Sequence, residues 1–139
     1  MIRAAIATDV DAIVAVLAAQ WADHHDDPWN AEQARNTVAA LIEAPHGVVF
    51  VVDRNGVAGV IGGACVPSPL SGVPISVEMF WVVSPSGRGF GISLLRAFEA
   101  WSRQQGARRC MASAPRPRVA MLLSRRQFKP AEISYGKTL

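Results

Sequence analysis

Hydrophobic positions recur along this chain at two spacings, one typical of helices and the other of strands. Apolar residues return every three or four positions from Ile13 to about Trp21, and again over residues 30–43 and 92–105. This spacing predicts three amphipathic helices. Nearly continuous apolar runs cover residues 47–53, 57–66 and 75–83. Runs of that length are typical of buried strands.

Shorter patterns complete the order of elements. Residues 2–5 and 109–113 read as short strands, residues 116–127 as a basic helix, and residues 130–139 as a last strand. The order β-α-α-β-β-β-α-β-α-β, with no internal repeat and no linker, predicts a single α/β domain over residues 1–139.

Three local signals refine this picture. Arg54-Asn55-Gly56 predicts a type I′ hairpin turn between the first two long strands. Gly62-Gly63 predicts a bulge or a close approach in the second of them. Glu99 and Arg103 stand four positions apart on the third helix, a favourable spacing for an ion pair.

Residues 84–91 connect the third long strand to the third helix and are the segment most informative about function. Ser84-Pro85 stops the strand, and glycines at 87, 89 and 91 surround Arg88. Glycines permit the backbone conformations and the close approach that a bound phosphate needs. The helix start adds partial positive charge to the full charge of Arg88. We infer that this turn binds a pyrophosphate.

The net charge of +3 combines two halves of opposite sign. Residues 1–87 hold three basic and nine acidic residues, whereas residues 88–139 hold eleven basic and two acidic ones. A polyanionic ligand is therefore expected on the C-terminal half, and a cationic one suits the N-terminal half. Nucleic acid is the rival partner for the basic half, but the arginines are dispersed and few aromatic residues accompany them.

Other features exclude several classes of protein. The two cysteines, Cys65 and Cys110, have no metal-binding or disulfide-framework spacing. No apolar run is long enough to span a bilayer, and the first residues lack the pattern of a signal peptide. We expect a cytoplasmic protein with reduced thiols, no membrane association and no metal.

The whole chain resembles the GNAT superfamily of N-acetyltransferases. The likeness includes IRAAIATDVDAI, VVFVVDRNGVAGVIGG, ISVEMFWVVSPSGRGFGISLLRAFEAW and RRQFKPAEISYGKTL, and its most specific part is V-x-P-x-x-R-G-x-G from Val83 to Gly91. The family pattern fits in two registers. One starts at Arg88 with Ser93 as its last small residue, and the other pairs Gly89 with Gly91 and places Ser86 at the basic position. Both registers place backbone amides between Arg88 and Ser93.

The resemblance implies a mixed, mostly antiparallel central sheet with helices on both faces, acetyl-coenzyme A as cofactor, and a homodimer. It also implies acetyl transfer to a primary amine of a small molecule or peptide, by direct attack in a ternary complex. The residues expected to hold the cofactor are Val82 and Val83, through their backbone, and Arg88, Gly89, Phe90, Gly91, Ile92 and Ser93.

Glu78 is the candidate general base. It is the one carboxylate in residues 75–83, and partial burial would raise its pKa toward that of a working base. Family members often carry a glutamate on the corresponding strand. A general acid is missing, because Leu123 stands where the family often has tyrosine, and Tyr135 is expected to be structural. A coenzyme A-binding module without catalysis is therefore the alternative.

The segment Asp23-His24-His25-Asp26-Asp27 suggests a metal site at first, but adjacent histidines point different ways and no matching ligand cluster stands nearby in the sequence. Two readings remain. The segment is either a solvated loop or the rim of the acceptor pocket, where its carboxylates would attract a cationic amine. Trp21, Trp29 and Trp81 are expected in the core or in the pocket wall.

Overall fold

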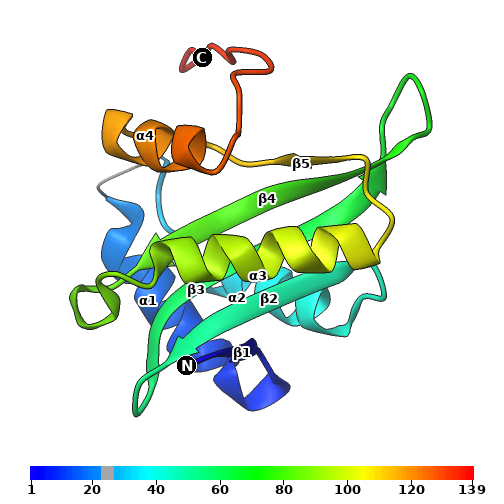
Figure 1. Cartoon of the computed structure of the whole chain (residues 1–139). Helices are drawn as coiled ribbons and strands as arrows, with labels where there is room; N and C mark the ends of the chain where they lie inside the picture. Colours follow the sequence, from blue (N-terminus) through cyan, green and yellow to red (C-terminus); the bar gives the residue numbers. More distant parts are fainter. Residues whose placement is uncertain (23–26) are drawn as a thin grey trace.

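The computed structural model describes residues 1–22 and 27–139 as a five-stranded sheet with helices on both faces (Figure 1). The strands lie in the order β1-β2-β3-β4-β5. The first four are antiparallel neighbours, and β5 runs parallel to β4. The elements are β1 (Ile2–Ala4), η1 (Ala7–Asp9), α1 (Val10–Trp21), α2 (Ala31–Glu43), β2 (Gly47–Asp53), β3 (Val57–Pro67), β4 (Pro74–Val83), η2 (Pro85–Gly87), α3 (Gly91–Gln104), β5 (Arg109–Met111) and α4 (Pro117–Arg125).

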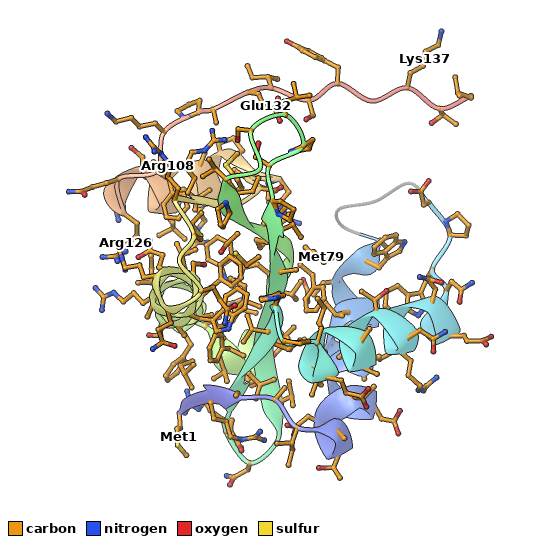
Figure 2. The ribbon with its side chains drawn as sticks, turned by 90° about the vertical axis from the view of Figure 1, so that its right-hand side faces the viewer. Met1, Met79, Arg108, Arg126, Glu132 and Lys137 are labelled. Atoms are coloured by element: carbon orange, nitrogen blue, oxygen red, sulfur yellow. The ribbon has the colours of Figure 1, made fainter. Side chains whose placement is uncertain are left out.

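The two faces of the sheet bury different clusters. Figure 2 views the sheet nearly along its edge, with α3 on one side and α1 and α2 on the other. Alternation along β2 explains this layering, because Val48 and Val52 pack with Phe98 of α3, whereas Val49 and Val51 pack with Ile13 of α1. Burial of both faces accounts for strands that read as continuous apolar runs.

The local turn signals are found where the sequence predicted them. Asn55 and Gly56 have φ angles of 57° and 130°, the positive values that a type I′ turn needs at both central residues. The β3–β4 register shifts at Gly62/Gly63, but the extra residue of the bulge lies opposite them in β4. The close approach predicted at these glycines is confirmed, because an added side-chain carbon would collide with Phe80 at Gly62 and with the carbonyl oxygen of Val77 at Gly63. Asn30 caps α2 by accepting a 2.9 Å hydrogen bond from the backbone N–H of Gln33.

Two expectations from the sequence are wrong. Residues 130–139 were expected to form a strand, but they are exposed and form no ladder with the described sheet. The described sheet ends at β5, whose ladder with β4 is only three residues long. Glu99 pairs with Arg126 at 2.6 Å rather than with Arg103, because the basic segment after α4 returns to α3. None of the described helices is long and apolar enough to cross a membrane.

Candidate active site

A cleft opens where β4 and β5 separate. The parallel ladder joins only Ile75–Val77 to Arg109–Met111, whereas β4 continues to Val83. Beyond Val77 this edge of β4 has no strand partner among the described residues. The cleft has a volume of about 830 Å³, within the usual range for small-molecule sites. Its walls come from α1, the segment before α2, α2 itself, β4, the start of α3 and the segment from Ser113 to Leu122.

Glu78 lies in this cleft at the point of separation. Its carboxylate oxygen Oε2 accepts a 3.0 Å hydrogen bond from the backbone N–H of Ser113, which follows β5. Burial raises the pKa of Glu78 above its ordinary value, and the hydrogen bond from Ser113 offsets part of that rise. The expected direction of the shift is confirmed. Glu78 is thus a partly desolvated carboxylate fixed at the junction of two strands.

The bulge in β4 decides which way these side chains face. Glu78 pairs with Gly63 and Phe80 pairs with Gly62, so Met79 is the extra residue. Because Gly62 and Gly63 are consecutive, the side chains of Glu78 and Phe80 lie on opposite faces although they are two positions apart. Phe80 packs in the cluster beneath α1 and α2. Regular alternation would have placed Glu78 beside it.

Val82 and Val83 combine packing with exposure of the strand edge. Both line the cleft. Their side chains pack on opposite faces of the sheet, Val82 toward α1 and Val83 toward α3. On the β3 side they pair with Val60 and Gly59. Their other edge borders the cleft, so an extended ligand there would meet main-chain groups.

The glycine turn presents several unpaired amides at the start of α3. The N–H of Phe90 donates to the carbonyl oxygen of Gly87 at 3.1 Å, and that of Leu94 donates to Phe90 at 3.0 Å. Within the part of the chain that the structure describes, the N–H groups of Gly89, Gly91, Ile92 and Ser93 have no such acceptor. Gly89 has a φ of 92°, a backbone conformation that glycine adopts readily and that lets the chain turn here into α3. The turn therefore offers donors to an anion.

Close packing beneath the turn fixes its position. The hydroxyl of Ser84 donates to the carbonyl oxygen of Ala58 at 2.8 Å, and its backbone N–H reaches the same oxygen at 3.0 Å. Gly87 is buried, and a side-chain carbon there would collide with that carbonyl. Only glycine lets the turn pack so closely onto β3.

The predicted cofactor residues divide into two groups. Val82, Val83 and Gly91 line the cleft together with Glu78. Arg88 and Gly89 are exposed at the adjoining turn, and Phe90, Ile92 and Ser93 are half-buried beside them. Only Gly91 of this turn reaches the cleft lining. The turn is thus one entrance to the cleft rather than part of its interior.

Sequence reasoning did not assign a role to Arg54 in this region. Its guanidinium carbon lies 5.3 Å from the centre of the Phe90 ring, a cation–π distance. The contact links the β2–β3 hairpin to the residue that precedes α3. No sequence signal indicated it, because the two residues meet only through the fold.

Aromatic side chains form much of the remaining wall. Trp21, Trp29 and Trp81 all line the cleft, as the expectation of core or pocket wall allowed. The Trp21 and Trp29 rings are 5.5 Å apart and tilted by 58°. Asp27 also lines the cleft, whereas Asp23, His24, His25 and Asp26 lie outside the described residues.

The α4 segment adds charge but no acid. Arg116 and Arg118 line the cleft, and sequence reasoning had treated them only as part of a basic helix. Leu123 is buried against α3, and its neighbour Leu122 faces the cleft. Neither hydrocarbon side chain can donate a proton. Tyr135, expected to be structural, is 90% exposed.

Comparison with known families identifies this arrangement. The family model "Acetyltransferase (GNAT) family" matches residues 12–121. The chain belongs to this acetyltransferase family. The match covers the sheet from β2 onward, the glycine turn and most of α4. GNAT enzymes transfer an acetyl group from acetyl-coenzyme A, and the chain is accordingly an acetyl-coenzyme A-dependent N-acetyltransferase.

Solved structures show the same GNAT fold. An acetyltransferase from Trypanosoma brucei has a TM-score of 0.76 and 18% identity, with 100% of this chain and 99% of that chain covered. Glucosamine-6-phosphate N-acetyltransferase from Arabidopsis thaliana has a TM-score of 0.79 and 12% identity, covering 99% and 97%. AAC(6')-Iy, solved with the bisubstrate analogue CoA-S-monomethyl-acetylneamine, has a TM-score of 0.76 and 19% identity, covering 100% and 98%. No curated protein sequence matches the chain significantly.

The residues present fit the coenzyme that the family uses. Unpaired amides at the start of α3 suit a pyrophosphate. The uncovered edge of β4 suits an extended pantetheine arm. No group of three or more metal-ligating side chains occurs in residues 1–22 and 27–139.

Proposed function

We propose that this enzyme acetylates a primary amine by direct attack on the thioester within a ternary complex, with Glu78 as general base. The observation that carries the proposal is the placement of Glu78. Its carboxylate has a raised pKa, is fixed by Ser113, and lies where β4 and β5 part. A base at this gap between the strands can receive a proton from an amine bound in the cleft.

The cofactor-binding role is assigned to two regions of the chain. Arg88 and the amides from Gly89 to Ser93 would hold the pyrophosphate, with the N–H of Phe90 least available because it already donates to Gly87. The backbones of Val82 and Val83 would hold the pantetheine and orient the carbonyl. The fixed position of the turn over Ala58 keeps these two regions in register.

Bound acetyl-coenzyme A supplies a thioester, whose carbonyl carbon bonds to the amine nitrogen while the carbon–sulfur bond breaks. Glu78 takes the proton that the nitrogen loses. A backbone N–H of β4 directed at the carbonyl oxygen would stabilise the charge that develops there. A thiol has a pKa of about 8.5, so the sulfur leaves as thiolate without a strong acid. This is consistent with hydrocarbon side chains at Leu122 and Leu123.

The lining supports direct attack over a covalent enzyme intermediate. Such an intermediate needs an activated nucleophile, usually a cysteine or a serine beside a histidine. Cys65 and Cys110 do not line the cleft, and no histidine does so among the described residues. Burial also raises the pKa of Cys110 to about 11, which keeps it a poorly reactive thiol.

The test measures cofactor binding and turnover separately. Calorimetry with coenzyme A should give a binding heat, and a thiol-release assay across a panel of primary amines should show turnover with the wild-type protein. Binding without release of thiol from any amine would favour a coenzyme A-binding module. Steeply salt-dependent DNA binding, with no heat from coenzyme A, would favour a nucleic-acid partner.

A further inference from the structure

The walls of the cleft on the α1–α2 side differ from the rest of the site, and they indicate which amine it takes. We propose that the acceptor is a monoamine whose amino group is carried, on a short linker, by a flat aromatic ring. This inference rests on the proposed acetyl transfer, because it assigns the second substrate of that reaction. It follows from the aromatic pair, the bulged methionine and the charge balance of the lining.

Both members of the aromatic pair offer ring surface, and for Trp21 the ring is nearly all that the side chain offers. Trp21 and Trp29 come from the end of α1 and from the segment before α2, and their rings lie 5.5 Å apart at 58°. The indole N–H of Trp21 already donates to the carbonyl oxygen of Asp27 at 2.6 Å. Because an indole has no other donor and no acceptor, this side chain offers a ligand mainly its ring. Aromatic ligands gain from tilted or offset contacts with such rings.

Met79 places a flexible apolar side chain opposite this pair. As the extra residue of the bulge it has no partner in β3, and it is 56% exposed while lining the cleft. Figure 2 shows it on the side of the sheet that faces α1 and α2. Methionine sulfur makes favourable contacts with ring edges. An exposed methionine beside Glu78 thus suits an aromatic body whose amine points at the carboxylate.

The charge of the lining formed by residues 1–22 and 27–139 favours one positive group over several. Among the described lining residues the carboxylates are Asp27 and Glu78, and Arg116 and Arg118 oppose them with equal positive charge. The polar residues that α2 contributes, Gln33 and Thr37, are neutral. A polyamine would bring its additional ammonium groups toward neutral amides or toward guanidinium groups, and like charges there disfavour binding.

The rival ligand is a polyamine held by cation–π contacts with the two tryptophans. The experiment therefore compares 2-phenylethylamine with propylamine, 2-cyclohexylethylamine and spermidine in the thiol-release assay. We expect kcat/KM for 2-phenylethylamine to exceed each of the others at least about tenfold, from ring contacts and apolar burial. Preference for spermidine, or equal values for 2-phenylethylamine and either propylamine or 2-cyclohexylethylamine, would overturn the proposal.

A matched pair of variants tests the role of the ring. Trp29→Leu keeps apolar volume but removes the ring, and it should raise KM for 2-phenylethylamine about tenfold, a larger factor than for propylamine. Trp29→Phe should retain most of the preference. Trp101→Phe is the control, because Trp101 stacks on Phe98 of the same helix α3 and does not line the cleft. An unchanged preference in folded Trp29→Leu would contradict the assignment.

The readouts separate this inference from the proposed function. Absence of coenzyme A binding, or of turnover with every amine, would overturn acetyl transfer and this inference with it. Coenzyme A binding together with turnover that does not depend on an aromatic ring would overturn the acceptor class alone. Quenching of tryptophan fluorescence by 2-phenylethylamine offers a binding measurement that does not depend on turnover. Quenching that persists unchanged in Trp29→Leu would contradict the proposed contact.

Discussion

The backbone N–H of Ser113 donates a 3.0 Å hydrogen bond to the carboxylate of Glu78. This bond joins the segment that follows β5 to the middle of β4, at the place where the two strands part. The carboxylate is therefore held by main chain, while burial keeps its pKa above the ordinary value. A carboxylate in such a setting can be tested as a base with little disturbance of its surroundings.

Glu78→Gln should lower kcat by about 10²–10⁴-fold, the range in which a general base usually contributes. The affinity for coenzyme A should stay unchanged, because the anion turn and β4 backbone are untouched. The amide oxygen can still accept from Ser113. Stopped-flow or steady-state thiol release gives kcat, and calorimetry gives the affinity. Equal losses of turnover and affinity would argue against a role as base.

As the pH is lowered, the wild-type enzyme should lose activity at a higher pH than it would if its general base were a glutamate of ordinary pKa. The base works when deprotonated, so kcat/KM should fall as pH drops through the raised pKa of Glu78. Stability has the opposite sign, since a raised folded-state pKa costs stability as pH rises through it. Glu78→Gln should therefore melt no lower than wild type at neutral pH, and its advantage should vanish below the ordinary glutamate pKa. A lower melting temperature for the variant at neutral pH would contradict this.

Gly87→Ala should destabilise the fold by about 1–3 kcal/mol, the usual cost of added atoms in a packed site. Its new carbon would meet the carbonyl of Ala58, so the turn must move and coenzyme A affinity should fall as well. Gly91→Ala is the stability control, because its new carbon would lie 3.6 Å from Val83 in ordinary contact. Urea unfolding measures the stability of both variants. Equal stability of the two variants would show that the turn moves freely.

Arg88→Gln should weaken coenzyme A binding roughly tenfold, the loss of one charged hydrogen bond at an exposed site. The effect should shrink at high salt because exposed charges are screened. Arg96→Gln is the matched control, since Arg96 is an exposed arginine on the same helix α3 that does not adjoin the turn. Calorimetry at low and high salt distinguishes the two. Equal losses would mean that net charge alone attracts the cofactor.

Arg126→Ala should destabilise the protein by about 1–3 kcal/mol, because it leaves the buried carboxylate of Glu99 without its partner. The double variant Glu99→Leu/Arg126→Met should recover much of that loss, since two apolar residues need no partner. Turnover should be unchanged in the double variant, as neither residue lines the cleft. A double variant no more stable than Arg126→Ala would contradict this account of the pair.

The sequence predicted most of the fold because its signals were local. Helix α2 begins after Asn30 and ends at Glu43, close to the predicted bounds, since a cap and a regular apolar face define it. The prediction of a last strand was wrong because a strand needs a neighbouring strand edge to pair with. Residues 130–139 pair with no such edge in the described structure. The Glu99–Arg103 pair failed for a similar reason. The spacing of Glu99 and Arg103 was favourable, but Glu99 pairs instead with Arg126, which lies 27 positions away in the sequence.

The site was predicted less completely, and the cause is the bulge. Glu78 could be selected as the one carboxylate of its strand, but its direction could not, because alternation places it with Phe80. Trp21 and Trp29 were expected in the core or in the pocket wall, and their mutual contact was not predicted. Arg54, Arg116 and Arg118 enter the site only through tertiary packing, which no spacing in the chain records.

Met79, the unpaired residue of the bulge, determines which face of the sheet the β4 side chains on either side of it occupy. A residue inserted between Gly62 and Gly63 would give Met79 a partner, restore strict alternation, and exchange the faces of every side chain between Pro74 and Glu78 relative to Phe80. The carboxylate would then turn away from Ser113, although no catalytic residue had been replaced. In this enzyme the one-residue difference between the paired stretches of β3 and β4 is as much a chemical requirement as the identity of the residues.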